Sequence, residues 1–160
     1  MKNLIVVGAM LLVLIGCRTV PITERPPIIV PPGLTEDQVE LAIMYSMFGA
    51  RPGPNPAAEP PAVGARAELP FKKVRGSEWD FEGSQPGVII GSVSPRTHYL
   101  RVRIEYDAHT VGVTIDGANN LKYSGSRIHG RANQWIDNLE RTIRSGLNLA
   151  AISQQQSRVR

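Results

Sequence analysis

Apolar and polar residues alternate most regularly over residues 100–106, and the alternation returns over residues 111–115. A period of two is typical of a strand that buries one face and exposes the other. Asp107-Ala108-His109 predicts a tight turn between these strands, so they are expected to pair as an antiparallel hairpin. Two shorter runs, at residues 79–82 and 87–94, predict two further strands.

Two other segments have the pattern of helices. Thr35 and Gln38 have the spacing of a capping box, and they predict a first helix over residues 34–49 that is apolar on nearly every side past its first turn. A second helix is predicted from about residue 127 to residue 149, with Ser126 as its N-cap. Its apolar stripe consists of Ile128, Ala132, Trp135, Ile136, Leu139, Ile143 and Leu147.

Together these elements predict an α+β fold, in which an antiparallel sheet of about four strands carries both helices on one face. The core domain is expected to span residues 71–150. A stretch rich in proline, glycine and alanine at residues 50–70 predicts a loop, or alternatively a domain boundary that leaves the first helix as a detachable arm. The polar residues 151–160 predict a frayed tail. The chain of 160 residues is long enough for one such core and too short for two.

The N-terminal segment is typical of a bacterial secretory signal. Lys2 gives it a positive start, an apolar run extends from Leu4 to Ile15, and Gly16 is the small residue beside the cleavage site. The apolar run is too short to span a bilayer. Residues 1–16 are therefore predicted to be removed, which leaves Cys17 as the first residue of the mature chain.

The run Leu14-Ile15-Gly16-Cys17 resembles the lipobox of bacterial lipoproteins. This resemblance implies that Cys17 is acylated and anchors the mature chain in a membrane. Arg18 stands where lipoproteins retained in the inner membrane typically have aspartate. The resemblance therefore implies sorting to the outer membrane, with the domain facing the periplasm.

Residues 17–33 contain five prolines and are expected to link the anchor to the domain. Proline at this density disfavours a helix or a central strand and favours an extended, semi-rigid polyproline conformation. At about 3.1 Å per residue, such a linker is expected to hold the domain some tens of ångströms from the membrane.

Ile128-His129 followed by Asn133-x-Trp135 resembles a segment of small uncharacterised proteobacterial lipoproteins, in which an Ile-His pair opens a terminal helix. These proteins also resemble the chain in the order of lipobox, short helix, antiparallel strands and terminal helix. The resemblance implies no reaction. The chain departs from the pattern at Ala132, where an aromatic residue is usual, and at Ala118, where serine is frequent. Both departures put any ligand-binding role of those positions in doubt for this chain.

The three histidines do not form a metal-binding pattern. His98, His109 and His129 have no histidine or cysteine neighbour at the spacing of a zinc site. His129 is expected instead to cap the second helix and to fix the loop of residues 122–126 against the helix start.

Two sets of residues have the composition of a catalytic site without its pattern. A serine that acts in a hydrolytic triad stands in a nucleophile elbow, and the serines of the first set lack that sequence context. The carboxylates of the second set would have to face one cleft to cleave a glycoside. Glu105 falls on the solvated face of a strand, where cross-strand ion pairing is its ordinary role. The triad set is Ser124, Ser126, His129 and Asp137, and the carboxylate set is Glu105, Asp107 and Asp116.

The formal net charge is +4, and the cations are spread along the chain instead of forming one basic stripe, which argues against a nucleic-acid partner. They are expected to form a solvated surface, with anionic lipid headgroups or lipopolysaccharide phosphates as the alternative. On the second helix, spacing predicts the ion pairs Asp137–Arg141 and Glu140–Arg144. The single cysteine excludes an intramolecular disulfide.

The sequence therefore predicts a non-catalytic outer-membrane lipoprotein, without a cofactor or metal, that binds a partner in the envelope. The alternative is a lipid-anchored carrier or sensor of a small or lipidic ligand held between the sheet and the helices. An enzyme is the third class, and it requires a polar cleft around His129.

Overall fold

The computed structural model describes residues 18–48 and 79–158. Cys17, the predicted leader and the predicted loop at residues 50–70 lie outside the described residues. Within the described part, no helix is both long enough and apolar enough to cross a membrane. The elements in chain order are β1 (Thr19–Pro21), β2 (Ile28–Ile29), α2 (Glu36–Phe48), β3 (Trp79–Gln85), β4 (Val88–Val93), β5 (Tyr99–Tyr106), β6 (Thr110–Asn119), β7 (Arg127–His129) and α3 (Gly130–Arg158).

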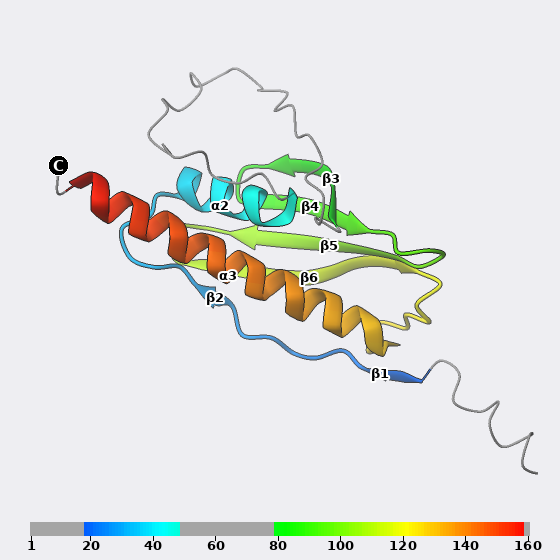
Figure 1. The fold of residues 1–160 in the computed structure, drawn as a ribbon. Coiled ribbons are helices and arrows are strands. Elements are labelled where there is room, and N and C mark those ends of the chain that lie inside the picture. The colour runs from blue at the N-terminus through cyan, green and yellow to red at the C-terminus, as the bar shows by residue number, and fades with distance from the viewer. Residues whose placement is uncertain (1–17, 49–78, 159–160) are drawn as a thin grey trace, which may run out of the picture.

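The predicted α+β class is confirmed (Figure 1). The main sheet has the antiparallel order β2-β6-β5-β4-β3, and both helices lie on one of its faces. It contains the four predicted strands and gains β2 as a fifth. A second sheet pairs β1 with β7.

The predicted hairpin forms between β5 and β6. Leu100, Val102 and Ile104 of β5 are completely buried toward the helices. The turn is held by Asp107, whose Oδ1 accepts hydrogen bonds from the backbone N–H groups of His109 (2.6 Å) and Thr110 (2.7 Å). These bonds lower the pKa of the Asp107 carboxyl, because they favour its ionised form.

Helix α2 begins with the predicted capping box. The Thr35 Oγ1 accepts from the Gln38 N–H at 3.3 Å, and the Gln38 side-chain oxygen accepts from the Thr35 N–H at 3.0 Å. The helix packs against the core and against α3. At the crossing of the two helices, a methyl group added to Gly146 would collide with Ser46 and come within 3.1 Å of the Ala42 carbonyl oxygen, so this glycine permits the close approach.

Helix α3 begins and ends later than its sequence pattern predicts. Residues 127–129 form β7, so the predicted start and the Ser126 N-cap are wrong. His129 takes the capping role expected of it, because its Nδ1 accepts from the Arg131 N–H at 3.3 Å. At the other end, α3 continues to residue 158, and the predicted frayed tail is wrong over residues 151–158. The Gln154 side chain bonds the Gln38 side chain of α2 at 3.3 Å, which holds this last part of α3 against the fold.

Residues 19–30 form an extended segment that we call the N-terminal strap, and the prediction of a free spacer over residues 17–33 is wrong for it. Its first residues pair with β7, and its last residues pair with the start of β6. Ile28 and Val30 are 1% and 5% exposed, so apolar burial fixes the strap against the domain. The chain thus crosses the whole length of the domain before α2 begins (Figure 1).

Arg25 fastens the middle of the strap to α3. Its side chain is only 9% exposed. Nη2 donates to the Asp137 carboxylate at 2.8 Å, and Nε lies 3.5 Å from the Glu140 carboxylate. The remaining donors reach the backbone carbonyls of Thr23 (2.7 Å) and Asn133 (3.2 Å).

The two acidic residues of α3 therefore face Arg25 instead of the arginines one turn further along. The predicted pair Asp137–Arg141 is wrong: Arg141 Nε donates to the backbone carbonyl of Asp137 at 3.3 Å. Arg144 acts on Glu140 only as a nearby charge. Burial raises the pKa of the Glu140 carboxyl, and the charge of Arg25 opposes this rise.

Arg25→Met is expected to lower the free energy of unfolding at pH 7 by about 2 kcal/mol, because it leaves the half-buried Glu140 without its cation. Without Arg25 the pKa of Glu140 rises further, so the native state binds its proton more tightly than the unfolded chain. The loss of stability in the Arg25→Met variant should therefore grow as pH rises through the folded pKa of Glu140. It should be smallest below the unfolded pKa of this carboxyl, which is about 4.5.

Urea denaturation at several pH values measures this effect. Arg141→Met, on the exposed side of the same helix, is the control and should change stability little. Adding Glu140→Gln to Arg25→Met should recover part of the loss. Equal stabilities of the Arg25→Met and Arg141→Met variants would contradict this account of the strap.

Candidate functional site on the open face of the sheet

The face of the main sheet opposite the helices is polar and carries an open hollow. Because side chains alternate along a strand, burial of Leu100, Val102 and Ile104 toward the helices turns Arg101 and Arg103 to this second face. The hollow has a volume of about 290 Å³ and is lined by Glu82, Gly83, Ser84, Gln85, Val88, Ile90, Arg101, Arg103 and Asp116.

Two β-bulges shape the site. In the β3–β4 pair, Phe81 opposes Gly91 and Gly83 opposes Ile90, so Glu82 is the extra residue of the first bulge. In the β5–β6 pair the register shifts in the same way, and the extra residue is Asp116. Bulges re-aim the side chain of the extra residue and occur frequently beside functional sites.

Both bulged residues place a carboxylate on one arginine. Arg101 Nε lies 3.1 Å from Glu82 Oε2 and 3.1 Å from Asp116 Oδ2. Neither oxygen lies in line with the N–H, so this buried nitrogen makes no hydrogen bond within the described residues. The Arg101 side chain as a whole is nevertheless 42% exposed. Arg101 is thus held in place at its Nε and remains open to a partner.

Glu82 is further organised by two hydroxyl groups. Ser92, at 4% exposure, hydrogen-bonds its carboxylate, and the Tyr99 hydroxyl donates to Oε1 at 2.7 Å. The Ser92 and Tyr99 bonds and the charge of Arg101 lower the pKa of Glu82, although burial acts in the opposite direction. The same contact with Glu82 raises the pKa of Tyr99. Glu82 is therefore an organised anion, whereas glycoside chemistry needs a carboxyl of raised pKa as its acid.

The other carboxylates predicted as candidates do not join one cleft. Glu105 accepts from Arg103 Nε at 2.8 Å, along the same strand instead of across strands as expected. Asp107 holds the β5–β6 turn, at a distance along the sheet from the bulges. Only Asp116 of that set lines the hollow.

The histidines and the serines of the predicted triad lie elsewhere. The His98 and His129 rings stack with centroids 5.7 Å apart, and the Trp135 ring lies 6.5 Å from His98, so this cluster ties the turn before β5 to the start of α3. Ser124 and Ser126 are exposed in the loop before β7, whereas the Asp137 carboxylate binds Arg25. In residues 18–48 and 79–158, no group of three His, Cys, Asp or Glu side chains is placed to hold a metal.

The sequence contains an indication of the two bulges that the alternation of apolar and polar residues does not reveal. Glu82 precedes Gly83 and Asp116 precedes Gly117, and glycine inside a strand pattern frequently marks a bulge. Comparisons with protein-family models, curated proteins and solved structures gave no match to this chain.

Ser92→Ala is expected to raise the pKa of Glu82 toward its ordinary value, because the Ser92 hydrogen bond is the largest cause of its lowering. A carboxyl with a lowered folded pKa stabilises the fold above its unfolded pKa and loses that contribution as pH falls through the folded pKa. The Ser92→Ala variant should therefore have a lower free energy of unfolding than the natural protein at neutral pH, and the difference should be smaller in acid.

An NMR titration of the Glu82 carboxyl carbon measures the shift directly. Ser84→Ala, which removes an exposed hydroxyl at the same hollow, is the matched control and should leave the titration unchanged. If both variants titrate like the unmodified protein, Ser92 does not organise this site.

Proposed function

We propose that this chain is an outer-membrane lipoprotein, acylated at Cys17 and facing the periplasm, whose domain binds another envelope protein through the open face of its sheet. The proposed binding role is supported by the ion pairs that Arg101 makes with the carboxylates of both bulge residues, Glu82 and Asp116. The role as an anchor rests on the lipobox-like run that ends at Cys17.

The form of the site supports a protein partner over a small molecule. Small-molecule sites are mostly enclosed and apolar, with few polar groups. The hollow beside Arg101 is open and carries charges of both signs, which suits the polar atoms of another protein surface. Arginine is also enriched at protein interfaces, because its planar guanidinium pairs with carboxylates and stacks on flat groups.

A lipidic ligand between the sheet and the helices is the weaker candidate. That layer is filled by side chains, and Ile43, Met47 and Ile104 within it are completely buried. A methyl group added at Gly91 of β4 would collide with the end of the Met47 side chain, which shows how closely α2 lies on the sheet. A ligand there would have to displace this core.

Acylation labelling with a fatty-acid probe tests the anchor. The chain with its natural sequence is expected to take up the label and to fractionate with the outer membrane, whereas the Cys17→Ser variant should lose the label. Arg18→Asp is the matched control, because it should keep the label and move to the inner membrane. A labelled Cys17→Ser variant, or an unlabelled natural chain, would contradict the anchor.

Photo-crosslinking in intact cells tests the binding face. A photoreactive residue at Thr114, which lies beside Arg103 on the open face, is expected to give a discrete adduct with an envelope protein. The same residue at Thr142, exposed on α3, should give none. Arg101→Gln should abolish the Thr114 adduct because it removes the organised cation. Absence of a Thr114 adduct, or equal adducts from both positions, would rule out this face.

A further inference from the structure

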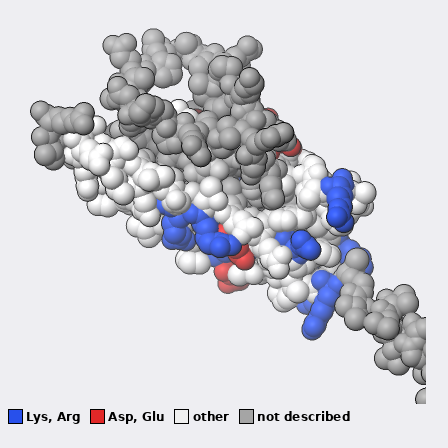
Figure 2. Space-filling model, in the orientation of Figure 1, with Lys and Arg blue, Asp and Glu red and all other residues white. Residues whose placement is uncertain are grey.

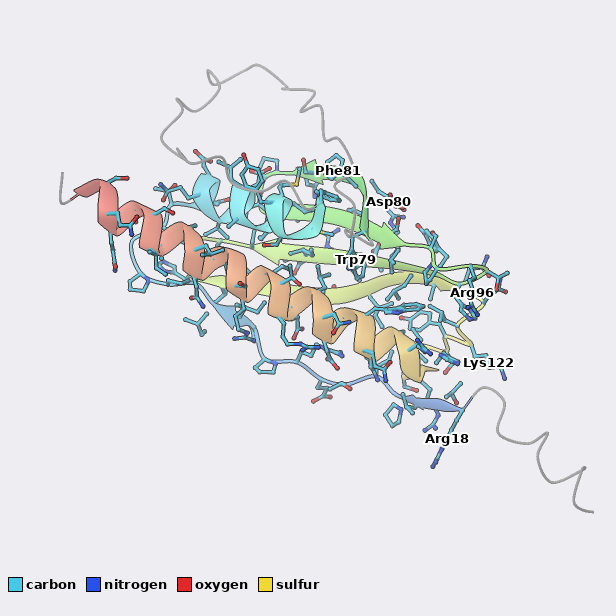
Figure 3. The ribbon with its side chains drawn as sticks, viewed as in Figure 1. Arg18, Trp79, Asp80, Phe81, Arg96 and Lys122 are labelled. Atoms are coloured by element: carbon cyan, nitrogen blue, oxygen red, sulfur yellow. The ribbon has the colours of Figure 1, made fainter. Side chains whose placement is uncertain are left out.

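Five of the eleven Lys and Arg residues in the described part of the chain lie at one end of the domain. Three segments meet there, residues 18–22, 94–99 and 119–131, and they contain no Asp or Glu. We call this the basic end, and its exposed cations are Arg18, Arg96, Lys122, Arg127 and Arg131. Figure 3 labels Arg18, Arg96 and Lys122 at the same end of the ribbon, and Figure 2 shows several of these blue side chains at that end of the visible face.

The basic end is a rigid surface because its three segments are bonded to one another. Arg127 Nη2 donates to the backbone carbonyl of Thr19 at 2.8 Å, which joins β7 to the strap. The Asn120 side-chain amide donates to the Thr97 carbonyl at 2.7 Å, which joins the loop after β6 to the turn before β5. The stacked His98 and His129 rings, described above, tie the same turn to β7.

The backbone at the basic end is strained. Within the described residues, positive φ angles outside glycine occur only at Arg96 (58°), Asn120 (57°) and Lys122 (51°), all of them at this end. Non-glycine residues adopt this left-handed region at a cost, and such strain tends to cluster at functional positions. Two of the three strained residues are cations.

The opposite end of the domain is acidic. Residues 34–40 and 105–109 contain no Lys or Arg and carry Glu36, Asp37, Glu40, Glu105 and Asp107. These two segments lie together, since the Tyr106 hydroxyl donates a hydrogen bond to the Glu40 carboxylate and lies near the charge of Glu36. The domain is therefore charged in opposite senses at its two ends.

The strap places the predicted anchor at the basic end. Strand β1 begins at Thr19 and is paired with β7 there, so only Arg18 lies between it and Cys17, which is two residue steps away along the chain. Two residues reach at most about 7 Å. This is within the Debye length of about 10 Å at 0.1 M salt, so the cations next to Thr19, which are Arg18 and Arg127, would act on the surface in which Cys17 is anchored.

We propose that the basic end docks on anionic lipid headgroups, so that the domain stands on the membrane with its acidic end directed away. This inference rests on the proposed acylation of Cys17 and adds to it a second contact with the bilayer. Tyr123, 41% exposed in the strained loop, suits the interfacial region, where tyrosine is enriched. Helix α3 also begins at this end, and its dipole adds positive potential.

The orientation is tested with the acylated full chain, in which an introduced thiol is unique because Cys17 is the only natural cysteine and is modified. Ser124→Cys places a fluorescent label at the basic end, and Ser157→Cys places the same label near the far end of α3. Each labelled protein is reconstituted into phosphatidylcholine vesicles with or without phosphatidylglycerol, and quenching by acrylamide is measured.

On phosphatidylglycerol vesicles, the label at position 124 is expected to be quenched several-fold more slowly than the label at position 157. The difference should disappear on phosphatidylcholine alone and in 1 M salt, where the Debye length falls to about 3 Å. Arg96→Gln with Lys122→Gln should also abolish it, whereas Arg141→Gln with Arg144→Gln, on the exposed side of α3, should not.

The mass of the Cys17 peptide separates the two proposals. If Cys17 carries acyl groups but both labels are quenched equally on anionic vesicles, the docking of the basic end is wrong and the lipoprotein proposal stands. If Cys17 carries no acyl group, the anchor is wrong and the docked orientation fails with it.

Discussion

The attachment of the N-terminal strap to the domain is the constraint on which the rest of the structure depends. The strap pairs with β7 at the basic end and with β6 at the acidic end, and Arg25 joins its middle to α3. Its pairing makes residues 127–129 a strand, which decides where α3 begins. Its apolar residues Ile28 and Val30 complete the core along one edge of the sheet. A chain without the strap would leave this edge of the core open to water.

The charges on the open face of the sheet contribute less to stability than the charge of Arg25 does. Arg25 is 9% exposed and pairs with Glu140, whose charge burial would otherwise penalise, so it stabilises the fold. Arg101 is 42% exposed, and an ion pair at such a site contributes only about 0–1 kcal/mol. The two bulges that bring Glu82 and Asp116 to Arg101 interrupt the pairing of four strands. An arrangement that interrupts pairing for so little stability is better explained by binding than by folding.

The sequence predicts those parts of the fold in which local pattern and tertiary packing agree. Alternation in β5 and β6 and the capping box at Thr35 are such cases, because each is fixed by residues close together in the chain. The strap was missed because its prolines predict an extended conformation without saying what it contacts. The burial of Ile28 and Val30 on either side of an exposed Ile29 is a period-two signal that is too short to stand out.

The candidate site was harder to predict for a related reason. Strand register is set by hydrogen bonds between segments far apart in the sequence, and a bulge shifts it without changing the composition of either strand. Glu82 therefore has the pattern of an ordinary solvated strand residue, and Asp116 is a candidate carboxylate but is grouped with Glu105 and Asp107 instead of Glu82. Only Gly83 and Gly117 beside them indicate the interruptions. Likewise, Ile128 fits a helical stripe and a short strand equally well, and only the strap across from it selects the strand.

The two proposed surfaces are compatible because one is an end of the domain and the other is a side face. Strands β3 to β6 run along the length of the domain between the basic and the acidic end (Figure 1), so the open face is parallel to this axis. A domain that stands on its basic end would keep the hollow beside Arg101 facing sideways, clear of the bilayer in which Cys17 is proposed to be anchored. A long flexible linker would have let the domain turn in any direction. The strap removes that freedom, so a partner in the same membrane would meet the open face at a defined height and orientation, which lowers the entropy lost on binding.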